Sequence, residues 1–446
     1  KLVFSFGFLG LWCSKLMCEH SRWEICCRLA LSGRIVARVE VDKAGTIQEL
    51  RAIVEHGSFL DGELFGATRS WTYLYKGQCL ADADQICTAL VDGALIDLVC
   101  SCETPVIVTA SNDCTARIFP TGTADNLDSV ELRGHFGQVY ACVLSADHRH
   151  LVTASEDHSA RVWVLHNWQA VETQCLQHAG EVYSAVFSRN GQFIVTASQD
   201  CTARLWCAET GDQRWQFVHP DEVYLATFSF DDNLVLTASA AGVACVVSVE
   251  TGDVCFELAE HQAAVTRAEF SPRAMHVVTA STDRTARLWD CTDCTCAKCM
   301  HVTTTDAEVK FANFTADGQL VLLTCADGKA QVWCPKTGSV IWTFHYHAEA
   351  VYMAVACPSS SILALASEDG TASIWSLATG EFVFVLSGHA DAVTWISFSP
   401  CAKMLVTASW DGTSKIWSMD SGECLETLDG HAAPVLYAEF GKMVLR

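Results

Sequence analysis

A histidine, a serine and an aspartate lie close together near residue 190 of the chain. His178 precedes Ser198 by 20 residues, and Asp200 follows two residues after that serine, within the stretch GQFIVTASQDCTARLW. A hydrolase uses these three side chains together, because the histidine takes the serine proton and the carboxylate orients the histidine. One such set suffices for catalysis, so the number of sets in the chain tests this interpretation.

The stretch recurs along the chain at a nearly constant interval. Copies such as HLVTASEDHSARVW and MLVTASWDGTSKIW place an equivalent turn position every 41 to 44 residues. A period of this length is typical of a repeat architecture. The eight equivalent positions are Asp113, Asp157, Asp200, Ala241, Asp283, Asp327, Asp369 and Asp411. Eight copies argue against a single catalytic triad, and we expect the protein not to be an enzyme.

Each copy has the composition of four short β-strands. Two apolar runs flank a turn such as SQD or EDG, a third run such as EVYSAVFS precedes them, and a fourth such as SGECLETLD follows. Val, Ile and aromatic residues favour strands, whereas Asp and Gly favour the turns between them. Four strands in every repeat predict a β-propeller.

The chain resembles the WD-repeat family over residues 102–446. The Gly-His element of that family is matched by LRGH, LSGH and LDGH at 132–135, 386–389 and 428–431, and its closing dipeptide by RVW, RLW and KIW. The resemblance implies a buried hydrogen-bond chain of histidine, second-strand serine, turn aspartate and tryptophan in each blade. Buried polar groups need partners, and each missing bond costs about 1–3 kcal/mol. The predicted network comprises His135, Ser155, Asp157 and Trp163, then His178, Ser198, Asp200 and Trp206, then His389, Ser409, Asp411 and Trp417.

The number of repeats predicts an all-β propeller of eight blades, with seven blades as the alternative. The Gly-His positions also number eight, but they are offset by one from the acids. The first copy therefore lacks a histidine, and the last lacks an acid and a tryptophan. We expect residues 433–440 to supply one strand of the blade formed by residues 105–133, because closure pairs edges that would otherwise be exposed.

Three blades depart from the pattern, and we expect them to lack the full network and to be the softer ones. In the fourth blade, Ala241 and Val247 replace the acid and the tryptophan. In the sixth, Thr305 and Cys325 replace the histidine and the serine. In the first, Phe119 replaces the tryptophan.

Residues 23–101 resemble ubiquitin, and they predict a small α+β domain of the β-grasp type before the propeller. The segments that carry the resemblance are VEVDKAGTIQEL, LYKGQCLADADQI and DGALIDLVC, with Thr46 as the expected N-cap of a helix. Its recognition patch would map to Leu74 and Val99. Residues 1–22 form a leader that resembles a signal-peptide core, and a truncated start is the alternative.

The overall charge restricts the partners. The chain has 29 basic and 52 acidic residues, which gives a net charge of −23. Such a surface repels phosphate backbones and anionic membranes, so we expect neither nucleic acid nor membrane as a direct partner. Protein partners of basic character gain from it. We predict a cytoplasmic location, with the nucleus as the alternative.

The 24 cysteines do not indicate a small disulfide-rich protein, because this chain is long enough to bury a core. Many of them lie in apolar strand segments, where cysteine packs as a small hydrophobic residue. One cluster, CTDCTCAKCMH from Cys291 to His301, has spacing similar to a zinc site. Alternation of side chains along a strand argues against it, so the prediction is no metal and no cofactor.

Function must come from surface residues, since propellers support many activities. The family resemblance assigns two sets of positions to the partner-binding face, one just before each turn acid and one after the first valine of each repeat. The residues we predict to bind partners are Tyr140, Tyr183, Tyr224, Tyr352, Glu156, Gln199, Glu368 and Trp410. Tyrosine and tryptophan are enriched at the energetically important centres of interfaces.

The predicted function is a non-enzymatic scaffold, in which the propeller face binds protein segments and the ubiquitin-like domain recruits a second partner. An alternative is a ribosome-assembly factor, because a ubiquitin-like domain before an eight-bladed ring resembles the layout of the Notchless family. A ubiquitin-ligase substrate adaptor is a further alternative.

Overall fold

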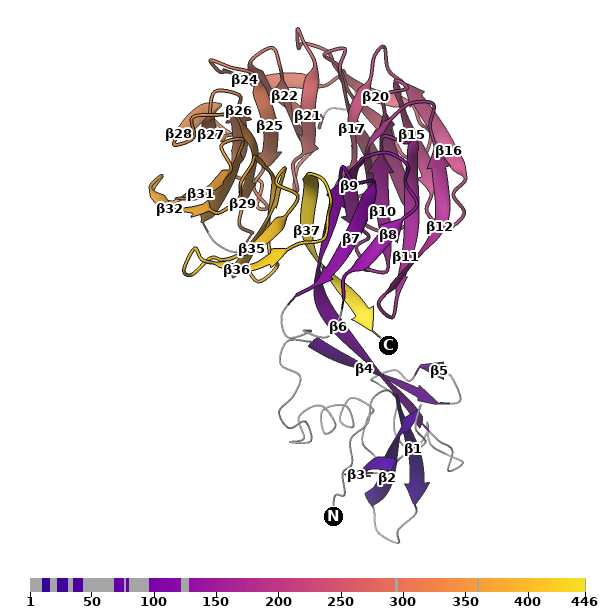
Figure 1. Ribbon diagram of the computed structural model, residues 1–446. Coiled ribbons are helices and arrows are strands. Elements are labelled where there is room, and N and C mark those ends of the chain that lie inside the picture. The colour runs from indigo at the N-terminus through magenta and orange to yellow at the C-terminus, as the bar shows by residue number, and fades with distance from the viewer. Residues whose placement is uncertain are drawn as a thin grey trace.

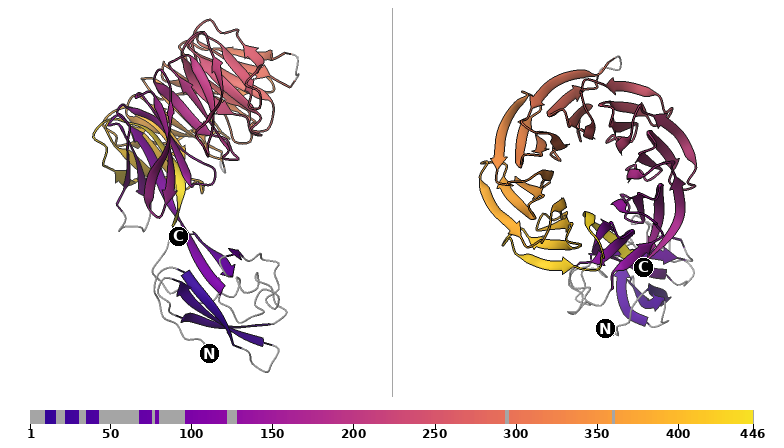
Figure 2. Two further views of the ribbon diagram at one scale, coloured as in Figure 1. Left: turned by 90° about the vertical axis from the view of Figure 1, so that its right-hand side faces the viewer. Right: turned by 45° about the horizontal axis from the view of Figure 1, so that its top comes forward.

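Seven four-stranded antiparallel sheets and four strands of a nine-stranded sheet form eight blades around a central axis (Figures 1 and 2). The computed structural model describes residues 96–121, 128–292, 296–358 and 361–445, and the strands at 10–16, 22–30, 35–42, 68–75 and 78–79. None of these residues forms a helix with the length and apolar character that a membrane span requires. The all-β eight-bladed propeller predicted from the repeat count is confirmed.

The blades follow one another along the chain, and the four strands of each blade run from the central channel outward. Blade 1 contains β37 (Val435–Leu445), β6 (Ile96–Ser111), β7 (Thr115–Pro120) and β8 (Val130–Arg133). Blade 2 contains β9 (Val139–Leu144), β10 (His150–Ser155), β11 (Ser159–His166) and β12 (Gln169–Gln177). Blade 3 contains β13 (Val182–Phe187), β14 (Phe193–Ser198), β15 (Thr202–Cys207) and β16 (Gln213–Val218). Blade 4 contains β17 (Val223–Phe228), β18 (Leu234–Ser239), β19 (Ala244–Ser248) and β20 (Val254–Leu258).

The remaining four blades repeat the arrangement. Blade 5 contains β21 (Val265–Phe270), β22 (His276–Ser281), β23 (Thr285–Asp290) and β24 (Lys298–Thr304). Blade 6 contains β25 (Val309–Phe314), β26 (Val321–Cys325), β27 (Lys329–Cys334) and β28 (Ser339–His345). Blade 7 contains β29 (Val351–Ala356), β30 (Ile362–Ser367), β31 (Thr371–Ser376) and β32 (Phe382–Ser387). Blade 8 contains β33 (Val393–Phe398), β34 (Met404–Ser409), β35 (Ser414–Ser418) and β36 (Cys424–Leu428).

The last strand of the chain closes the ring. β37 pairs antiparallel with β6, with Val435 opposite Ser111 and Phe440 opposite Ile107. In Figures 1 and 2 this yellow strand lies beside the purple strand β6. The prediction that residues 433–440 complete the first blade is therefore confirmed. The closure leaves neither end of the ring with an unpaired inner edge.

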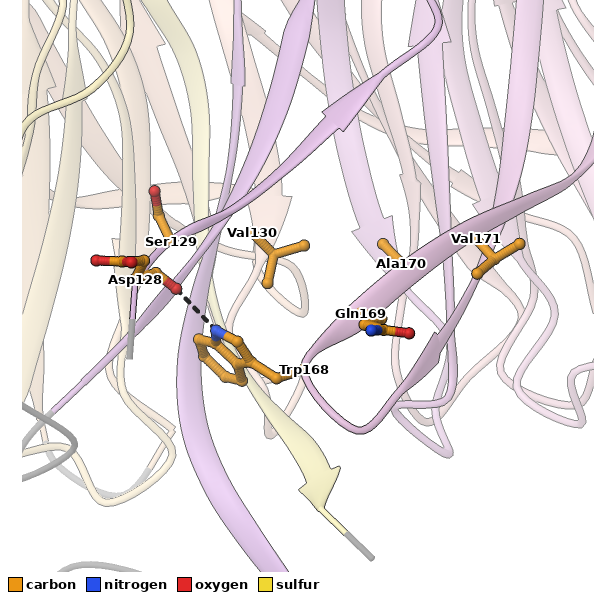
Figure 3. A pocket seen from close by; sticks show the side chains of 7 residues that line it. All are labelled: Asp128, Ser129, Val130, Trp168, Gln169, Ala170 and Val171. Atoms are coloured by element: carbon orange, nitrogen blue, oxygen red, sulfur yellow. Dashed lines mark hydrogen bonds between the residues drawn. The ribbon is translucent and has the colours of Figure 1, made fainter. Parts of the chain in front are cut away.

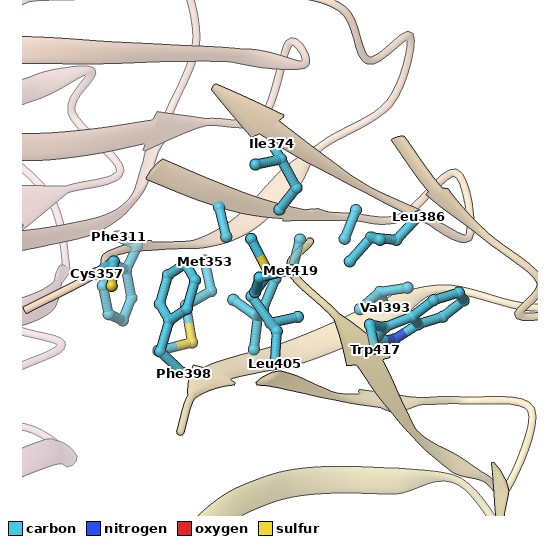
Figure 4. Packing of buried hydrophobic residues seen from close by; sticks show 14 residues of the cluster. Phe311, Met353, Cys357, Ile374, Leu386, Val393, Phe398, Leu405, Trp417 and Met419 are labelled. Atoms are coloured by element: carbon cyan, nitrogen blue, oxygen red, sulfur yellow. The ribbon is translucent and has the colours of Figure 1, made fainter. Parts of the chain in front are cut away.

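Apolar side chains fill the space between neighbouring blades. The second strand of most blades is almost wholly buried, whereas the outermost strand exposes many of its side chains. Figure 4 shows one such cluster, in which Ile374 and Leu386 of blade 7 meet Val393, Leu405 and Trp417 of blade 8. Because each cluster joins two adjacent blades, the ring holds together only when every blade has a neighbour on both sides.

β6 continues beyond the propeller and pairs with strands from the start of the chain. Its first half pairs with β1 (Gly10–Leu16) and β4 (Thr68–Tyr75), and β5 (Gln78–Cys79) pairs with β4. β2 (Arg22–Ala30) pairs with both β1 and β3 (Ile35–Asp42). One strand thus crosses the boundary that we placed between residues 101 and 102. The helix expected at Thr46 lies outside the described residues, and the ubiquitin-like domain stays a prediction.

Removal of residues 435–446 should open the ring. It takes away the strand that pairs with the propeller half of β6 and the buried side chains of Val435, Tyr437 and Ala438. We expect the free energy of unfolding to fall by roughly 5 kcal/mol or more, measured by guanidinium denaturation. A control that lacks only residues 444–446 keeps the buried side chains of β37 up to Met443 and should unfold close to the full chain. Equal stability of the longer deletion would contradict closure by β37.

Candidate functional site

The recurring histidine lies at the centre of a hydrogen-bond chain inside each complete blade. In blade 3, His178 Nδ1 lies 3.0 Å from Asp200 Oδ2, and His178 Nε2 lies 2.7 Å from Thr196 Oγ1. Trp206 Nε1 donates to the same Thr196 hydroxyl at 2.9 Å. The His178 side chain is wholly buried, and Asp200 also accepts the backbone amide of Ala179.

These contacts fit one protonation state of the histidine. Hydrogen bonds hold the pKa of Asp200 low despite its burial, so its carboxylate only accepts, and His178 Nδ1 carries the proton between them. The neutral ring then accepts the Thr196 hydroxyl at Nε2, while the hydroxyl oxygen accepts the indole N–H. Burial lowers the pKa of His178, although Asp200 opposes the shift. The network therefore contains a neutral imidazole and an ionised carboxylate.

The structure corrects the part predicted for the serine. Ser198 Oγ donates to the Gly180 carbonyl at 3.2 Å and accepts the backbone amide of Asp200, and it does not bond to His178. Ser155 and Ser409 make the same two kinds of bond in their blades. The imidazole instead meets the threonine two residues earlier, which points to the same face of the strand. His178 cannot activate Ser198 in this arrangement, because both of its ring nitrogens have other partners.

The other predicted members take the same places in their blades. His135 Nδ1 lies 2.8 Å from Asp157 Oδ2, and Trp163 Nε1 lies 3.0 Å from Thr153 Oγ1. His389, Asp411, Thr407 and Trp417 repeat this in blade 8. Blade 7 has Leu365 in place of the threonine, and its histidine and tryptophan both bond to Ser373, which faces Leu365 across the ladder. The hydroxyl has moved to the neighbouring strand, which the repeat pattern did not indicate.

The three departing blades each lose part of the chain of bonds. In blade 4, His219 Nε2 lies 2.8 Å from Thr237 Oγ1, but buried Nδ1 has no hydrogen-bond partner in the described chain. Burial lowers the pKa of His219 to about 4. In blade 6, the buried polar atoms of Thr324 and Trp333 likewise lack partners among the described residues. In blade 1, His431 bonds to Asp113 and Thr109, with Phe119 at its edge.

The predicted partner-binding tyrosines lie at β-bulges on the inner strands. The pairing register shifts between the first and third residues of β13, β17 and β29, so Tyr183, Tyr224 and Tyr352 fall between paired positions. Bulges of this kind re-aim a side chain away from the regular alternation. Each of these side chains, like that of Tyr140, is partly exposed. The inner ends of the blades therefore present tyrosines near one end of the central channel.

Three of these tyrosines form a continuous row. The ring centroids of Tyr140 and Tyr183 are 5.8 Å apart, and those of Tyr183 and Tyr224 are 5.7 Å apart. Tyr140 donates its hydroxyl proton to Glu181 at 2.8 Å, and Tyr183 donates to Glu222 at 3.2 Å. We call these five residues the tyrosine row. The sequence pattern found the tyrosines but not the two glutamates that hold them.

The remaining predicted residues form two groups. Tyr352, Glu368 and Trp410 belong to blades 7 and 8, and Glu156 and Gln199 belong to blades 2 and 3. Tyr352 and Trp410 are neighbours, with centroids 6.2 Å apart, and Glu368 contributes to the high pKa of Tyr352, which burial chiefly raises. Glu156 accepts the backbone amide of Gln138, and Gln199 precedes the turn acid of blade 3. Phe136, beside His135, is 90% exposed and was missed because it occurs in one repeat only.

Negative charge predominates on this face outside blade 6. Glu181, Glu222 and Glu368 are not ion-paired with a lysine or arginine of the described chain. Lys310 and Lys329 belong to blade 6 and pair with acids there. A row of aromatic rings between carboxylates can stack with and pair with cationic side chains.

Two hollows occur in the described part of the propeller. One, of about 560 Å³, lies in the central channel and is lined by the row tyrosines and by Arg267, Glu269, Trp395, Tyr437 and Glu439. The other lies between β8 and β12 (Figure 3), where Trp168 Nε1 donates to the Asp128 carbonyl at 2.7 Å. Trp168 there adopts a left-handed backbone with φ of 60°, which is costly for a bulky residue. This contact ties blade 2 to blade 1.

Two further sequence predictions concern residues near the limits of the described chain. Leu74 and Val99 lie on the paired strands β4 and β6, but their side chains lie outside the described residues. Within the cysteine cluster, Cys291 is buried and Cys296 is exposed, and Cys294 is not described. Among the described residues, no three His, Cys, Asp or Glu side chains group as metal ligands.

The comparisons with known proteins agree with this geometry. The profile of the family described as the IFT122 first beta-propeller matches residues 181–442, which is more than half of the chain. The chain belongs to this family. The WD domain, G-beta repeat family also matches residues 128–164. WD-repeat propellers are in general scaffolds for protein–protein interaction.

Among solved structures, the propeller is similar to the crystal structure of the computationally designed Ika8 protein. The TM-score is 0.62 at 25% sequence identity, over 70% of this chain and 93% of that chain. No curated protein matches the chain. The family profile and this likeness both concern the propeller, so they support the ring rather than the strands before it.

Replacement of Ala241 by Asp should restore the missing acid of blade 4. The new carboxylate would accept the proton of His219 Nδ1, as Asp200 does for His178 in blade 3. We expect the free energy of unfolding to increase by about 1–2 kcal/mol. We also expect the pKa of His219 to rise from about 4. Histidine titration by NMR measures the second effect. Ala326→Asp, one residue away from the turn acid of blade 6, is the control and should not stabilise the protein.

The buried networks should make the protein less stable in acid. Burial lowers the pKa of His178, His389 and His431 below about 6.5, and the hydrogen bonds of the network lower that of Asp411, despite its burial, to about 2. In both cases the unfolded chain binds more protons, so stability rises with pH over these ranges. We expect the free energy of unfolding to fall from pH 6.5 downward and to fall again below about pH 4. Denaturant titrations at pH 7, 5 and 3.5 measure it, and equal values at pH 7 and 5 would contradict the neutral-histidine network.

Proposed function

We propose that the protein is a non-enzymatic scaffold whose tyrosine-bearing face binds protein segments of basic character. The observation that carries the proposal is the tyrosine row, in which Tyr140 and Tyr183 are each held by a glutamate that has no cationic partner in the described chain. Rigid aromatic rings lose little conformational entropy on binding, and their faces attract lysine and arginine. Adjacent carboxylates add direct ion pairs and speed the encounter.

The arrangement of charge gives the bound segment a preferred track. Carboxylates without lysine partners lie in blades 3, 4 and 7, while the lysines of blade 6 already pair with Glu308, Asp306 and Asp327. A basic segment would therefore run along blades 2 to 4 and avoid blade 6. Phe136 and Trp410 extend the aromatic surface on either side of blade 1.

The role of the ubiquitin-like domain belongs to the same proposal. Residues 23–101 would dock a second partner, so that the scaffold joins two proteins. The sequence resemblance supports this, and the antiparallel pairing of β2 with β3 agrees with the first hairpin of such a domain. The ribosome-assembly alternative rests on this layout, and a ubiquitin-ligase substrate adaptor is a further alternative. We also propose that the protein is located in the cytoplasm, as predicted from the sequence.

Charge neutralisation on the tyrosine row tests the propeller part. Glu181→Gln with Glu222→Gln retains an oxygen that accepts the tyrosine protons, so the rings keep their place. The probe is a fluorescein-labelled library of ten-residue peptides with Lys or Arg at every second position. We expect roughly tenfold weaker binding and a smaller loss of affinity on adding salt, measured by fluorescence anisotropy.

Glu308→Gln is the matched control, because Glu308 lies on the same face but already pairs with Lys310 at 2.8 Å. It should leave binding of the library unchanged. Loss of binding with Tyr183→Ala and Trp410→Ala, at unchanged melting temperature, would place the contact on this face. Equal binding by the Glu181→Gln, Glu222→Gln variant and the unaltered protein would refute the proposal.

A further inference from the structure

The central channel contains an arginine without an ionic partner. Arg267 is the third residue of β21, and it lines the cavity of about 560 Å³ together with residues of five other blades. Its guanidinium lies over the ring of Phe311, at 4.7 Å from the ring centroid. No carboxylate of the described chain forms an ion pair with it, and its buried Nε has no hydrogen-bond partner there.

An arginine in this position lowers the stability of the fold unless an anion pairs with its guanidinium. Burial in the channel wall lowers the pKa of Arg267, because a cation loses solvation there. A buried guanidinium is normally paired with a carboxylate or fully hydrogen-bonded, since a charge without a partner destabilises the fold. Guanidinium N–H groups match a carboxylate in a planar, two-bond geometry.

The two acids of the cavity do not supply that carboxylate. Glu439 accepts the hydroxyl proton of Tyr437 at 2.5 Å. Burial raises the pKa of Glu269 to about 7, although Arg267 opposes the shift, and burial also raises the pKa of Glu439. Glu269 therefore carries less negative charge near neutral pH than an exposed glutamate does, so it repels an incoming anion less.

The cavity opens toward the tyrosine row. Tyr140, Tyr183 and Tyr224 line its wall and also form the row. A segment that lies on the row therefore has Arg267 below it. A hollow of about 560 Å³ along the channel has room for the last residues of one extended chain, with its terminal carboxylate near Arg267.

We propose that the channel binds the free C-terminal carboxylate of a basic protein segment, with Arg267 as the residue that recognises it. This rests on the proposed function, because the basic residues of the same segment would lie on the tyrosine row. The terminal carboxylate forms two hydrogen bonds with the guanidinium, and Trp395 and Tyr437 surround the last side chain.

The test compares the library of basic ten-residue peptides in two forms, one with a free C-terminal carboxylate and one amidated. Amidation removes the charge and leaves the rest of each peptide unchanged. For the unaltered protein, we expect the free-acid form to bind at least about tenfold more tightly. The reason is the charge-assisted hydrogen bond between its carboxylate and Arg267, which the amidated form cannot make. Trp395 fluorescence should change with the free-acid form.

Arg267→Met removes the charge and keeps the length of the side chain. We expect it to bind both forms of the library equally, at the affinity that the unaltered protein has for the amidated form. Its melting temperature should be equal or higher, because a partly buried charge without an ionic partner is replaced by an apolar group. Lys310→Met is the matched control, since Lys310 is an inner-strand cation in the next blade that pairs with Glu308, and it should retain the preference for the free acid.

Three outcomes would overturn the inference. Equal binding of the two forms by the unaltered protein would refute the channel site and leave the tyrosine row standing. Binding of N-acetylglycine that depends on Arg267, without discrimination between the peptide forms, would assign the site to a small carboxylate instead of a chain end. Absence of binding by either form would refute both this inference and the proposed function.

Discussion

A neutral histidine between a carboxylate and a hydroxyl constrains the interior of every complete blade. In blade 3, the Asp200 carboxylate can only accept, so the ring of His178 donates from Nδ1 and accepts at Nε2. The Thr196 hydroxyl donates to Nε2, and its oxygen accepts the indole N–H of Trp206. A second proton on the ring would place a positive charge in a buried site, which burial opposes. The indole, the hydroxyl, the imidazole and the carboxylate are thus oriented together, and they fix the turn and the loop that meet at the end of the blade.

The same chain of bonds also helps to close the ring. His431, near the end of the sequence, donates to Asp113 at 2.8 Å and bonds to Thr109, both of which belong to the first blade. The β37–β6 ladder joins the same two parts of the chain through the backbone. Closure therefore uses one interaction that every blade needs and one that only blade 1 needs. The two ends of the propeller cannot separate without breaking both.

The sequence was sufficient to predict the eight blades and their closure, because the period and the offset between histidines and acids are properties of the chain alone. It was insufficient to choose between Thr196 and Ser198 as the partner of His178. Both hydroxyls lie on one face of one strand, and only the position of the incoming loop decides which of them the ring reaches. The transfer of that hydroxyl to Ser373 in blade 7 depends on cross-strand register, which a repeat pattern does not contain.

On the inner strands, some positions carry nearly the same residue in every blade and one position varies. Their first residue is valine in all eight blades, and their fourth is alanine in six, because these positions pack between blades. Their third residue differs in every blade, and the eight are Ala141, Ser184, Leu225, Arg267, Phe311, Met353, Trp395 and Tyr437. A symmetric ring has no structural need for eight different side chains at equivalent positions. The channel is therefore asymmetric by sequence, with its one third-position cation in blade 5 and the Tyr437–Glu439 pair in blade 1, and a ligand inside it would meet a different surface on each side.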